Sequence, residues 1–308
     1  MSTRLRGIAR ETERIVAAGG YRASDGREVS LTAAVEAARA GTRTVGPEPV
    51  HVPAAPPADL RVEVTGESSL EAARRLVGAS VHGEPALGLG GGPVADGTAD
   101  LGGGADLGGE PVAVLNFASA RNPGGGFLNG AQAQEEALCR ASALYTCLLE
   151  ARGFYDHHRA HRDPLYTDRV IHSPAVPVFR DDRGRLLDEP YAVGFLTAAA
   201  PNAGVVLRTT PRRAGELPPA LSARAERVLE TAAAHGYRRL VLGAWGCGVF
   251  RNDPAQVAEA FRALLAAGGR FEHRFAHVVF GVLDRTPGGT VRAAFEHAFG
   301  RTGDQVQP

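Results

Sequence analysis

The sequence contains no lysine, so all 34 of its basic residues are arginine. This absence excludes mechanisms that need a lysine, such as a Schiff base or the lysine of a phosphate-binding P-loop. An excess of charge of one sign is also missing, because 34 acidic residues balance the basic ones. Proteins that bind nucleic acid or membrane surfaces without further specificity carry a basic excess, so neither class is expected.

Cysteine is scarce and widely spaced, with only Cys139, Cys147 and Cys247. No CxxC pair is present, which excludes a zinc knuckle and a thioredoxin-type redox motif. The odd count and wide spacing are typical of reduced cytosolic thiols. Cys247 lies in a glycine-flanked segment, and we interpret it as a small residue in a tight turn. No histidine stands at a spacing that indicates a cysteine nucleophile.

Long apolar runs are absent too, since no stretch approaches the ~20 consecutive apolar residues of a membrane span. The charged segment from Met1 to Arg14 lacks the apolar core of a secretory signal. We therefore expect a cytoplasmic protein. A chain of 308 residues with 44% hydrophobic residues can form one large domain or two small ones.

Hydrophobic periodicity predicts alternating strands and helices. Strands are expected at 62–64, 112–115, 170–172, 193–196, 240–242 and 277–280. Helices are expected at 5–16, 31–38, 68–77, 138–149, 217–235, 254–267 and 290–299. Ser68 and Glu71 match a capping box that opens the third of these helices. The alternation predicts a layered α/β domain with a mostly parallel central sheet.

Residues 83–109 differ from the rest of the chain, because 11 of these 27 positions are glycine. Such a composition does not offset the entropy of ordering, so we predict a flexible insert that acts as a tether. The residues from 301 to 308 are expected to form a frayed tail.

Two glycine-rich loops follow predicted strands. In the first, LNFASARNPGGGF, three consecutive glycines precede a helix start that carries Glu135 and Glu136. In the second, LGAWGCGVFRNDP, glycines alternate with other residues before Pro254 opens a helix. Backbone N–H groups of such loops can bind anions. Because both loops lie at the carboxyl ends of strands, we expect them to meet at one crevice.

The string NPGGGFLNGAQAQEE, with GAWGCGVFRNDP downstream, resembles the catalytic signature of the bacterial-type poly(ADP-ribose) glycohydrolases. These enzymes belong to the macrodomain superfamily of ADP-ribose-binding α/β proteins. The segments IARETERIVAAGGY, YTDRVIHSPAVPVFRDD and APNAG extend the resemblance over nearly the whole chain apart from the insert and the tail. It implies a macrodomain-like three-layer sandwich with a mixed, mostly parallel sheet. We expect this catalytic domain at 46–300 and a helical extension packed on it at 1–45.

The resemblance also implies roles for individual residues. Glu136 would be the catalytic acid and base, and Glu135 would hold the ribose hydroxyls beside the scissile bond. The substrate-binding residues implied are Asn122, Gly124, Gly125, Gly126, Gln134, Gly246, Gly248, Val249 and Phe250. Arg251 stands where a small residue is expected in many relatives. Neither a cofactor nor a metal is implied.

The chemistry of the two glutamates is constrained by their adjacency. Neighbouring helix positions point ~100° apart, so the two carboxyl groups cannot flank a glycosidic bond from opposite faces. One carboxyl must then act first as the acid and later as the base for water. A helix N-terminus favours the ionised form, so a functional acid there needs burial or a like charge to raise its pKa.

The other polar and aromatic candidates have simpler interpretations. His157 and His161 form an i, i+4 pair that could bind a metal, but no acidic or cysteine ligand motif accompanies them. We therefore interpret the Asp156-His157-His158 cluster as a solvated helix end. Trp245 is expected in the core, and Asn202 is expected in a turn.

Three functions remain open from the sequence. The first is hydrolysis of poly(ADP-ribose) with release of ADP-ribose. The resemblance implies cleavage from chain ends, because residues 1–45 would crowd the outer side of the adenosine ribose. The second is removal of single ADP-ribose units from protein or nucleic-acid acceptors. The third is a non-catalytic ADP-ribose-binding module. A monomer without membrane association is expected.

Overall fold

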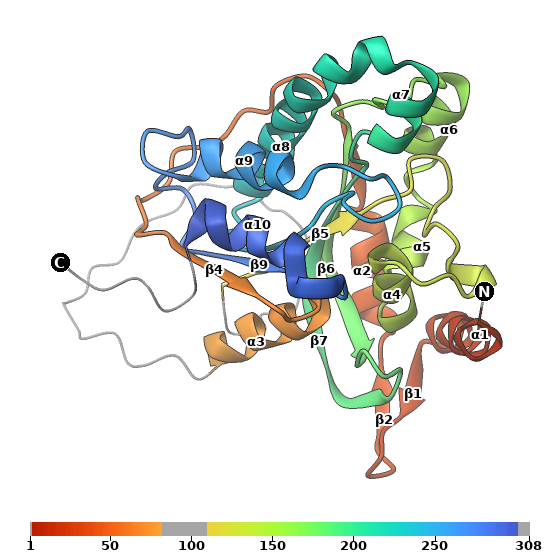
Figure 1. Cartoon of the computed structure of the whole chain (residues 1–308). Coiled ribbons are helices and arrows are strands. Elements are labelled where there is room, and N and C mark those ends of the chain that lie inside the picture. The colour runs from red at the N-terminus through yellow and green to blue at the C-terminus, as the bar shows by residue number, and fades with distance from the viewer. Residues whose placement is uncertain (1, 82–109, 301–308) are drawn as a thin grey trace, which may run out of the picture.

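The computed structural model describes residues 2–81 and 110–300, and at their centre is a seven-stranded sheet (Figure 1). Its strands are β3 (Arg43–Val45), β4 (Arg61–Thr65), β5 (Val112–Phe117), β6 (Val170–Arg180), β7 (Leu186–Ala198), β8 (Arg239–Leu242) and β9 (His277–Gly281). The strand order is β3-β6-β7-β5-β8-β9-β4. The strands from β7 to β4 in that order are parallel, whereas β6 is antiparallel to both of its neighbours. The predicted mixed, mostly parallel sheet is confirmed.

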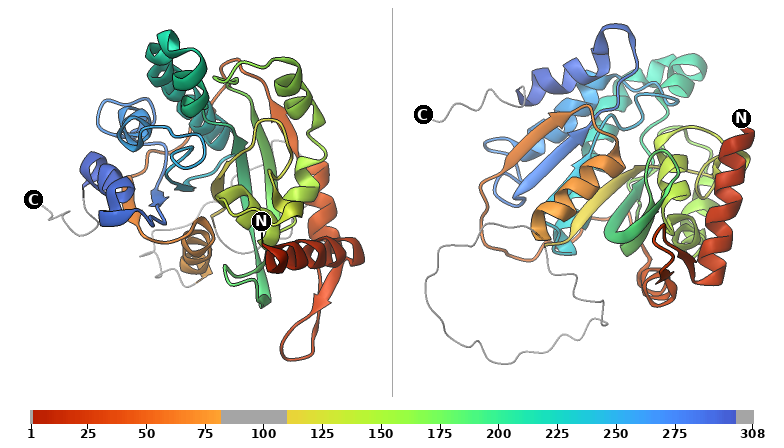
Figure 2. Two further views of the ribbon diagram at one scale, coloured as in Figure 1. Left: turned by 45° about the vertical axis from the view of Figure 1, so that its right-hand side comes forward. Right: turned by 90° about the horizontal axis from the view of Figure 1, so that it is seen from below.

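Helices cover both faces of this sheet, as the three views together show (Figures 1 and 2). The helices are α1 (Thr3–Ala18), α2 (Thr32–Gly41), α3 (Ser69–Val81), α4 (Gln134–Ala141), α5 (Leu144–Leu148), α6 (Arg152–Ala160), α7 (Ala203–Thr209), α8 (Leu217–Ala234), α9 (Pro254–Leu265) and α10 (Thr290–Phe299). Helices α1 to α6 share one hydrophobic core with the sheet, and α8 to α10 share the other. Strand β5 shows why both faces are covered: Val112 and Val114 pack in the first core, and Ala113 and Leu115 pack in the second.

Most elements match the sequence predictions, but the expected continuous helix at 138–149 was wrong. The structure has α4 and α5 instead, separated by Ser142, whose backbone is extended (φ −143°, ψ 177°). The Ser142 hydroxyl donates to the carbonyl of Leu138 at 2.8 Å and accepts from the N–H of Leu144 at 3.2 Å. The N–H of Ala143 donates to the carbonyl of Pro177 in β6 at 3.1 Å. Serine thus offers the backbone local partners in place of the helix.

The N-terminal segment forms more than the two predicted helices. A short hairpin of β1 (Gly20–Arg22) and β2 (Glu28–Ser30) joins α1 to α2, and it was not predicted. The segment ends in β3, the edge strand of the main sheet. Helix α1 packs against α4. The division into an extension at 1–45 and a domain at 46–300 stays a prediction, and the calls on 83–109 and 301–308 fall outside the described residues.

Helix α3 begins with the predicted capping box. The N–H of Ser68 donates to the Glu71 carboxylate at 2.9 Å, and the N–H of Glu71 donates to the Ser68 hydroxyl at 3.1 Å. Two donors at the helix start are therefore satisfied reciprocally, which fixes where α3 begins.

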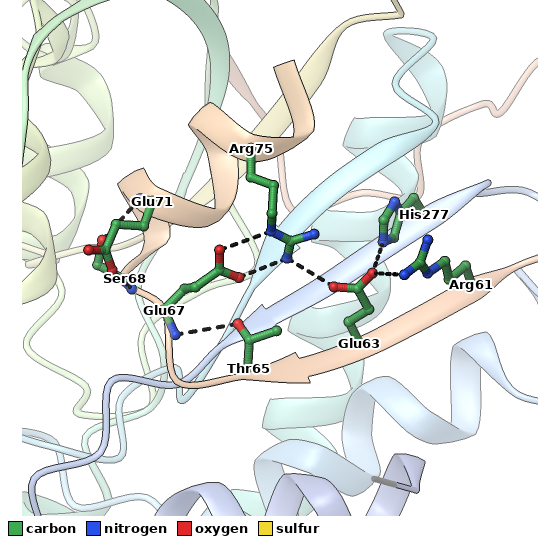
Figure 3. A network of polar contacts seen from close by, with 8 residues as sticks. All are labelled: Arg61, Glu63, Thr65, Glu67, Ser68, Glu71, Arg75 and His277. Carbon is green, nitrogen blue, oxygen red and sulfur yellow. Dashed lines mark hydrogen bonds and ion pairs between the residues drawn. The ribbon is translucent and has the colours of Figure 1, made fainter. Parts of the chain in front are cut away.

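A network of charged side chains anchors α3 to the sheet (Figure 3). Arg75 donates to Glu67 at 2.7 Å and to Glu63 of β4 at 2.9 Å. Glu63 also accepts from Arg61 at 2.7 Å and from His277 of β9 at 2.9 Å. The carboxylate of Glu63 is buried, and a buried carboxylate needs such partners to offset its desolvation. The network therefore fixes the orientation of α3 on β4 and β9.

Two further properties bear on the predictions. No helix in the described ranges is long and apolar enough to span a bilayer. Trp245 is buried, as predicted, and its indole N–H donates to the carbonyl of Ala198 at 3.0 Å.

Candidate active site

The first glycine loop connects β5 to α4 and folds back over the start of that helix. Gly124 and Gly125 have left-handed backbones, with φ of 65° and 57°. A Cβ atom on Gly125 would lie 2.5 Å from Oε1 of Glu136 and 3.0 Å from Oε2 of Glu135. Only glycine allows both this conformation and this approach to the two carboxyl groups.

The carboxylate of Glu136 links the glycine loop to the start of α4. Its Oε1 accepts from the N–H of Gly126 at 2.8 Å, and its Oε2 accepts from the N–H of Ala133 at 2.9 Å. The second bond is the carboxylate half of a capping box, because Ala133 is the N-cap residue of α4 and has no side-chain acceptor of its own. Glu136 therefore lies at a fixed place beside the three glycines.

Glu135 lies deeper, and its side chain is almost fully enclosed. Its Oε2 accepts from the N–H of Ser119 at 2.7 Å, and its Oε1 accepts from Nδ2 of Asn116 at 3.3 Å. Burial raises the pKa of Glu135 to about 8, the Ser119 N–H opposes that rise, and the carboxylate of Glu136 adds to it. The pKa of Glu135 therefore lies well above that of an ordinary glutamate.

An acid at this helix start needs burial or a like charge to keep its proton. Both glutamates are buried and adjacent, and the pKa of Glu135 is raised. The two carboxyl groups are unequal in their partners: Glu135 accepts from Ser119 and Asn116, and Glu136 accepts from two backbone N–H groups of the loop.

Gln134, predicted to bind substrate, is engaged inside the protein. Its Oε1 accepts from the N–H of Phe117 at 2.9 Å, and its Nε2 donates to the carbonyl of Leu115 at 2.7 Å. Nε2 also donates to the hydroxyl of Ser69 in the first turn of α3 at 3.1 Å. These bonds seat the start of α4 on the end of β5, so in this structure Gln134 positions the two glutamates. Its contact with substrate stays a prediction.

Asn122 lies exposed at the rim of the first loop. Its carbonyl accepts from the N–H of Gly125 at 2.9 Å, and its N–H donates to the Ser119 hydroxyl at 3.2 Å. Its role in binding substrate stays a prediction.

The second glycine loop follows β8 and is held by Asn252. The Asn252 amide donates to the carbonyl of Pro201 at 2.8 Å and to that of Gly246 at 3.3 Å. Gly246 has φ of 72°, and a Cβ atom on it would lie 2.4 Å from Nδ2 of Asn252. Sequence analysis did not single out Asn252. Its place directly before Asp253, the N-cap residue of α9, is the signal that could have found it.

The outer part of this loop is open. No atom lies within 4 Å of a Cβ built on Gly248, and Val249 is 81% exposed. Phe250 lies beside Tyr166, with ring centroids 5.8 Å apart. Tyr166 and Arg251 both have left-handed backbones, with φ of 58° and 57°. Non-glycine residues in this conformation cost free energy and cluster at functional sites, a signal that only the structure could provide.

The two loops follow adjacent parallel strands, β5 and β8. Both loops leave the carboxyl ends of these strands, so the two glycine loops and the two glutamates lie at one edge of the sheet.

The histidine cluster differs from its predicted solvated state at one position. His158 is buried, and its ring nitrogens bond the carbonyl of Phe154 at 2.8 Å and the hydroxyl of Thr167 at 2.9 Å. Burial lowers the pKa of His158 to about 4. His157 and His161 stack with ring centroids 4.2 Å apart. No cluster of three or more potential metal ligands occurs in the described ranges.

Two further sequence interpretations concern turn residues. Burial raises the pKa of Cys247 to about 12, so its thiol is protonated and is a poor nucleophile at neutral pH. Asn202 is the N-cap residue of α7, and its side chain accepts from the N–H of Val205 at 3.1 Å.

Comparison with known proteins identifies the family of this chain. The family model described as microbial-type PARG, catalytic domain, matches residues 9–181, where PARG denotes poly(ADP-ribose) glycohydrolase. The chain belongs to this family. A comparison with curated protein sequences finds no significant match.

Solved structures of PARG enzymes are similar over most of the chain. The enzyme from Thermomonospora curvata is 48% identical, with a TM-score of 0.84, over 97% of this chain and 100% of that one. The same enzyme bound to the inhibitor ADP-HPD is 47% identical, with a TM-score of 0.81 and the same coverage. The enzyme from Deinococcus radiodurans in complex with ADP-ribose is 40% identical, with a TM-score of 0.71, over 88% of this chain and 98% of that one. The family resemblance and the three-layer fold are confirmed.

Proposed function

We propose that this protein hydrolyses the ribose–ribose O-glycosidic bonds of poly(ADP-ribose) and releases ADP-ribose. The observation that carries the proposal is the pair of unequal carboxyl groups directly against the Gly124–Gly126 loop. Membership of the PARG family supports the same substrate, as do the similar structures that hold ADP-ribose and ADP-HPD.

Glu136 is the acid and base of the proposed reaction. Departure of the bridging ribose oxygen needs a proton, and the ribosyl centre then gains positive charge. In the reacting state the coupled pair of carboxyl groups holds one proton, and it lies on Glu136. Glu136 donates this proton to the bridging oxygen as the bond breaks and, as a carboxylate, takes a proton from the water that attacks. The N–H groups of Gly126 and Ala133 stabilise the carboxylate between these steps. Glu135 binds the ribose hydroxyls next to the bond.

The two backbone loops bind the rest of the nucleotide. The first loop places ribose and phosphate against Gly124–Gly126, and the second places its N–H groups around the diphosphate. Gly246, Gly248 and Val249 line this second site, and Phe250 packs against the bound nucleotide.

Cleavage from chain ends is the proposed mode. The N–H of Ser2 donates to the carbonyl of Gly130 at 3.1 Å, so the start of α1 lies against the catalytic loop. A Cβ atom on Gly130 would lie 2.4 Å from the Ser2 carbonyl oxygen, which shows how closely the segments approach. An extension at 1–45 that lies against this loop leaves less space for the further ADP-ribose unit that binding in the middle of a polymer chain requires. ADP-ribose as the first product in a chromatographic time course supports this mode, and long oligomers as first products contradict it.

Glu136→Gln tests the catalytic assignment. We expect loss of polymer hydrolysis with ADP-ribose binding retained in calorimetry, because glutamine keeps the shape of the side chain and cannot donate this proton. Near-wild-type turnover removes Glu136 from the mechanism. Assays of the wild-type protein on mono-ADP-ribosylated acceptors distinguish the second candidate substrate. Tight ADP-ribose binding without hydrolysis of either substrate indicates a binding module.

The proposed location is the cytoplasm. All three cysteines are free thiols, and Cys139 and Cys147 are buried in the core. Free thiols are typical of a reducing compartment. Fractionation of the producing cells tests this location.

A further inference from the structure

Asn116 lies beneath the active site, at the carboxyl end of β5, and contacts Glu135 from below. It pairs in register with Thr197 on the neighbouring parallel strand β7. Its Nδ2 donates to Oε1 of Glu135 at 3.3 Å and to the hydroxyl oxygen of Thr197 at 3.1 Å. All three side chains are buried. Together they form a closed polar cluster between the sheet and α4.

The other end of the same amide is unpaired. Among the described residues, none donates a hydrogen bond to Oδ1 of Asn116, although this atom is buried. The oxygen and nitrogen of an asparagine amide exchange places when the group turns by 180° about its last torsion, which has a broad profile. Oδ1 has no hydrogen-bond partner to lose when the amide turns over. The two bonds made by Nδ2 are replaced by bonds to Oδ1, which then lies beside Glu135 and Thr197.

We propose that Asn116 is a positioning residue that matches both protonation states of Glu135. The orientation in this structure, with Nδ2 donating to Oε1, is the one that matches the ionised form of Glu135. When Glu135 is protonated, the amide turns over and Oδ1 accepts the carboxyl proton. Thr197 follows the exchange, because its hydroxyl accepts from Nδ2 in one state and donates to Oδ1 in the other.

The consequence is a carboxyl group that keeps its place through its titration. Oε2 of Glu135 stays on the N–H of Ser119, and Oε1 stays on the Asn116 amide, with or without the proton. The importance of this for catalysis rests on the proposed function, whereas the coupling itself does not.

The other titratable groups that face Glu135 are Glu136 and Cys139 on α4 and Tyr155 on α6. Burial holds the pKa of Cys139 and of Tyr155 well above the usual values, so both stay neutral between pH 5 and about 8.5. Glu136 is then the group among them whose charge acts on Glu135. Asn116 is the described side chain that hydrogen-bonds to the Glu135 carboxyl group.

Nuclear magnetic resonance of the whole protein tests the proposal directly. With ¹³C-labelled glutamate carboxyls and ¹⁵N-labelled asparagine side chains, the amide signal of Asn116 is expected to change with the same midpoint as the Glu135 carboxyl. In Glu135→Gln, the Asn116 signal is expected to show no such transition. An Asn116 signal that stays constant while Glu135 titrates overturns the proposal.

Variants give a second measurement. Asn116→Asp replaces the donor with a like charge, so we expect the Glu135 midpoint to rise by about one pH unit or more. Thr197→Val leaves Glu135 as the single partner of Nδ2 of Asn116, so we expect a smaller shift of the Glu135 midpoint. The matched control is Thr231→Val in α8, where a buried hydroxyl donates to the carbonyl of Arg227 at 2.8 Å far from the site along the chain; no shift is expected there. An unchanged midpoint in Asn116→Asp also overturns the proposal.

Activity separates this inference from the proposed function. In Asn116→Asp, we expect the part of the pH profile of kcat that depends on Glu135 to shift by as much as the Glu135 midpoint measured by NMR. KM for the polymer is expected to change less than twofold. Coupled titration of Asn116 and Glu135 in a protein that cleaves no polymer leaves this inference standing and removes the proposed function.

Discussion

The two glycine loops of the crevice are built in opposite ways. The first is held from within by carboxyl groups: Glu135 accepts from Ser119, and Glu136 accepts from Gly126 and Ala133. The second is held at its base by Asn252 and is open at Val249. Groups that react need fixed geometry before substrate arrives. In the proposed function the first loop lies beside the reacting bond and the second binds the diphosphate, so preorganisation is expected to matter more in the first loop than in the second.

The largest effect is expected from Gly125→Ala in the rigid loop. The new methyl group would overlap the Glu136 carboxylate and would strain a backbone with φ of 57°. Because displacement of reacting groups by about 1 Å costs about 10²-fold in rate, we expect at least that loss in kcat. Steady-state kinetics on the polymer measures it, and a kcat within threefold of wild type would show that the first loop is not preorganised.

A smaller effect is expected from Asn252→Ala, which releases the base of the second loop. The lost bonds to Pro201 and Gly246 bind no reacting atom, so the change should appear in binding. The loss of a buried hydrogen bond corresponds to an increase in KM of about tenfold. A fall in kcat with unchanged KM would contradict the assignment of this loop to binding.

The pH dependence of stability distinguishes the loops as well. The pKa of Glu135 is about 8 in the folded protein and lies near 4.5 when the chain is unfolded. The folded state therefore keeps a proton that the unfolded state releases, and this carboxyl makes stability fall as pH rises from about 4.5 to about 8. Glu135→Gln removes this dependence. The change in this contribution between pH 5 and pH 8 is about 3.5 kcal/mol, so we expect the melting temperature of Glu135→Gln to gain about 5 °C on wild type over this range. Parallel curves for the two proteins would contradict the raised pKa.

Buried histidines have the opposite effect on stability, which they lower at low pH. Burial lowers the pKa of His158 to about 4 and that of His172 to about 3, from ordinary values near 6.5. The unfolded chain binds these protons first, so stability falls as pH drops below about 6.5. His172→Gln is expected to flatten the acid limb of a melting-temperature profile, and an unchanged limb would assign acid unfolding to other groups.

The smallest effect is expected from Gly248→Ala, the counterpart of the first variant. A Cβ atom on Gly248 meets no atom within 4 Å, and its φ lies outside the left-handed region. Both kcat and KM should stay within about twofold of wild type, as at surface positions without special features. A large loss here would mean that the open loop closes tightly on its ligand.

The fold could be predicted because its signals are local. Apolar runs such as 112–115 and 277–280 become buried strands, and the Ser68–Glu71 pair caps α3 through bonds three residues apart. The break at Ser142 could not be predicted, since the competing partner, the Pro177 carbonyl, lies on a strand distant in sequence. Three-residue strands such as β3 carry too few residues to show a period.

The place of the two glutamates beside a glycine loop could be predicted from the motif, but the contacts that make them unequal could not. The sequence places Glu135 and Glu136 side by side at a helix start. It contains no information on which carboxyl group lies against Asn116 and which one lies against the glycine loop. Burial decides that, and burial depends on how α4 is seated over β5. The hydrogen bonds of Gln134 to β5 and α3 could not be predicted from the sequence for the same reason.

Gln134 links three segments that are far apart in the sequence: the start of α3, the end of β5 and its own helix. The reacting groups can therefore reach their working arrangement only after the central layer and the α3 layer have assembled. Recovery of enzymatic turnover during refolding should consequently keep pace with the fluorescence of the buried Trp245, with no earlier, partly folded species able to work. Turnover and the native fluorescence of Trp245 should therefore be gained and lost together.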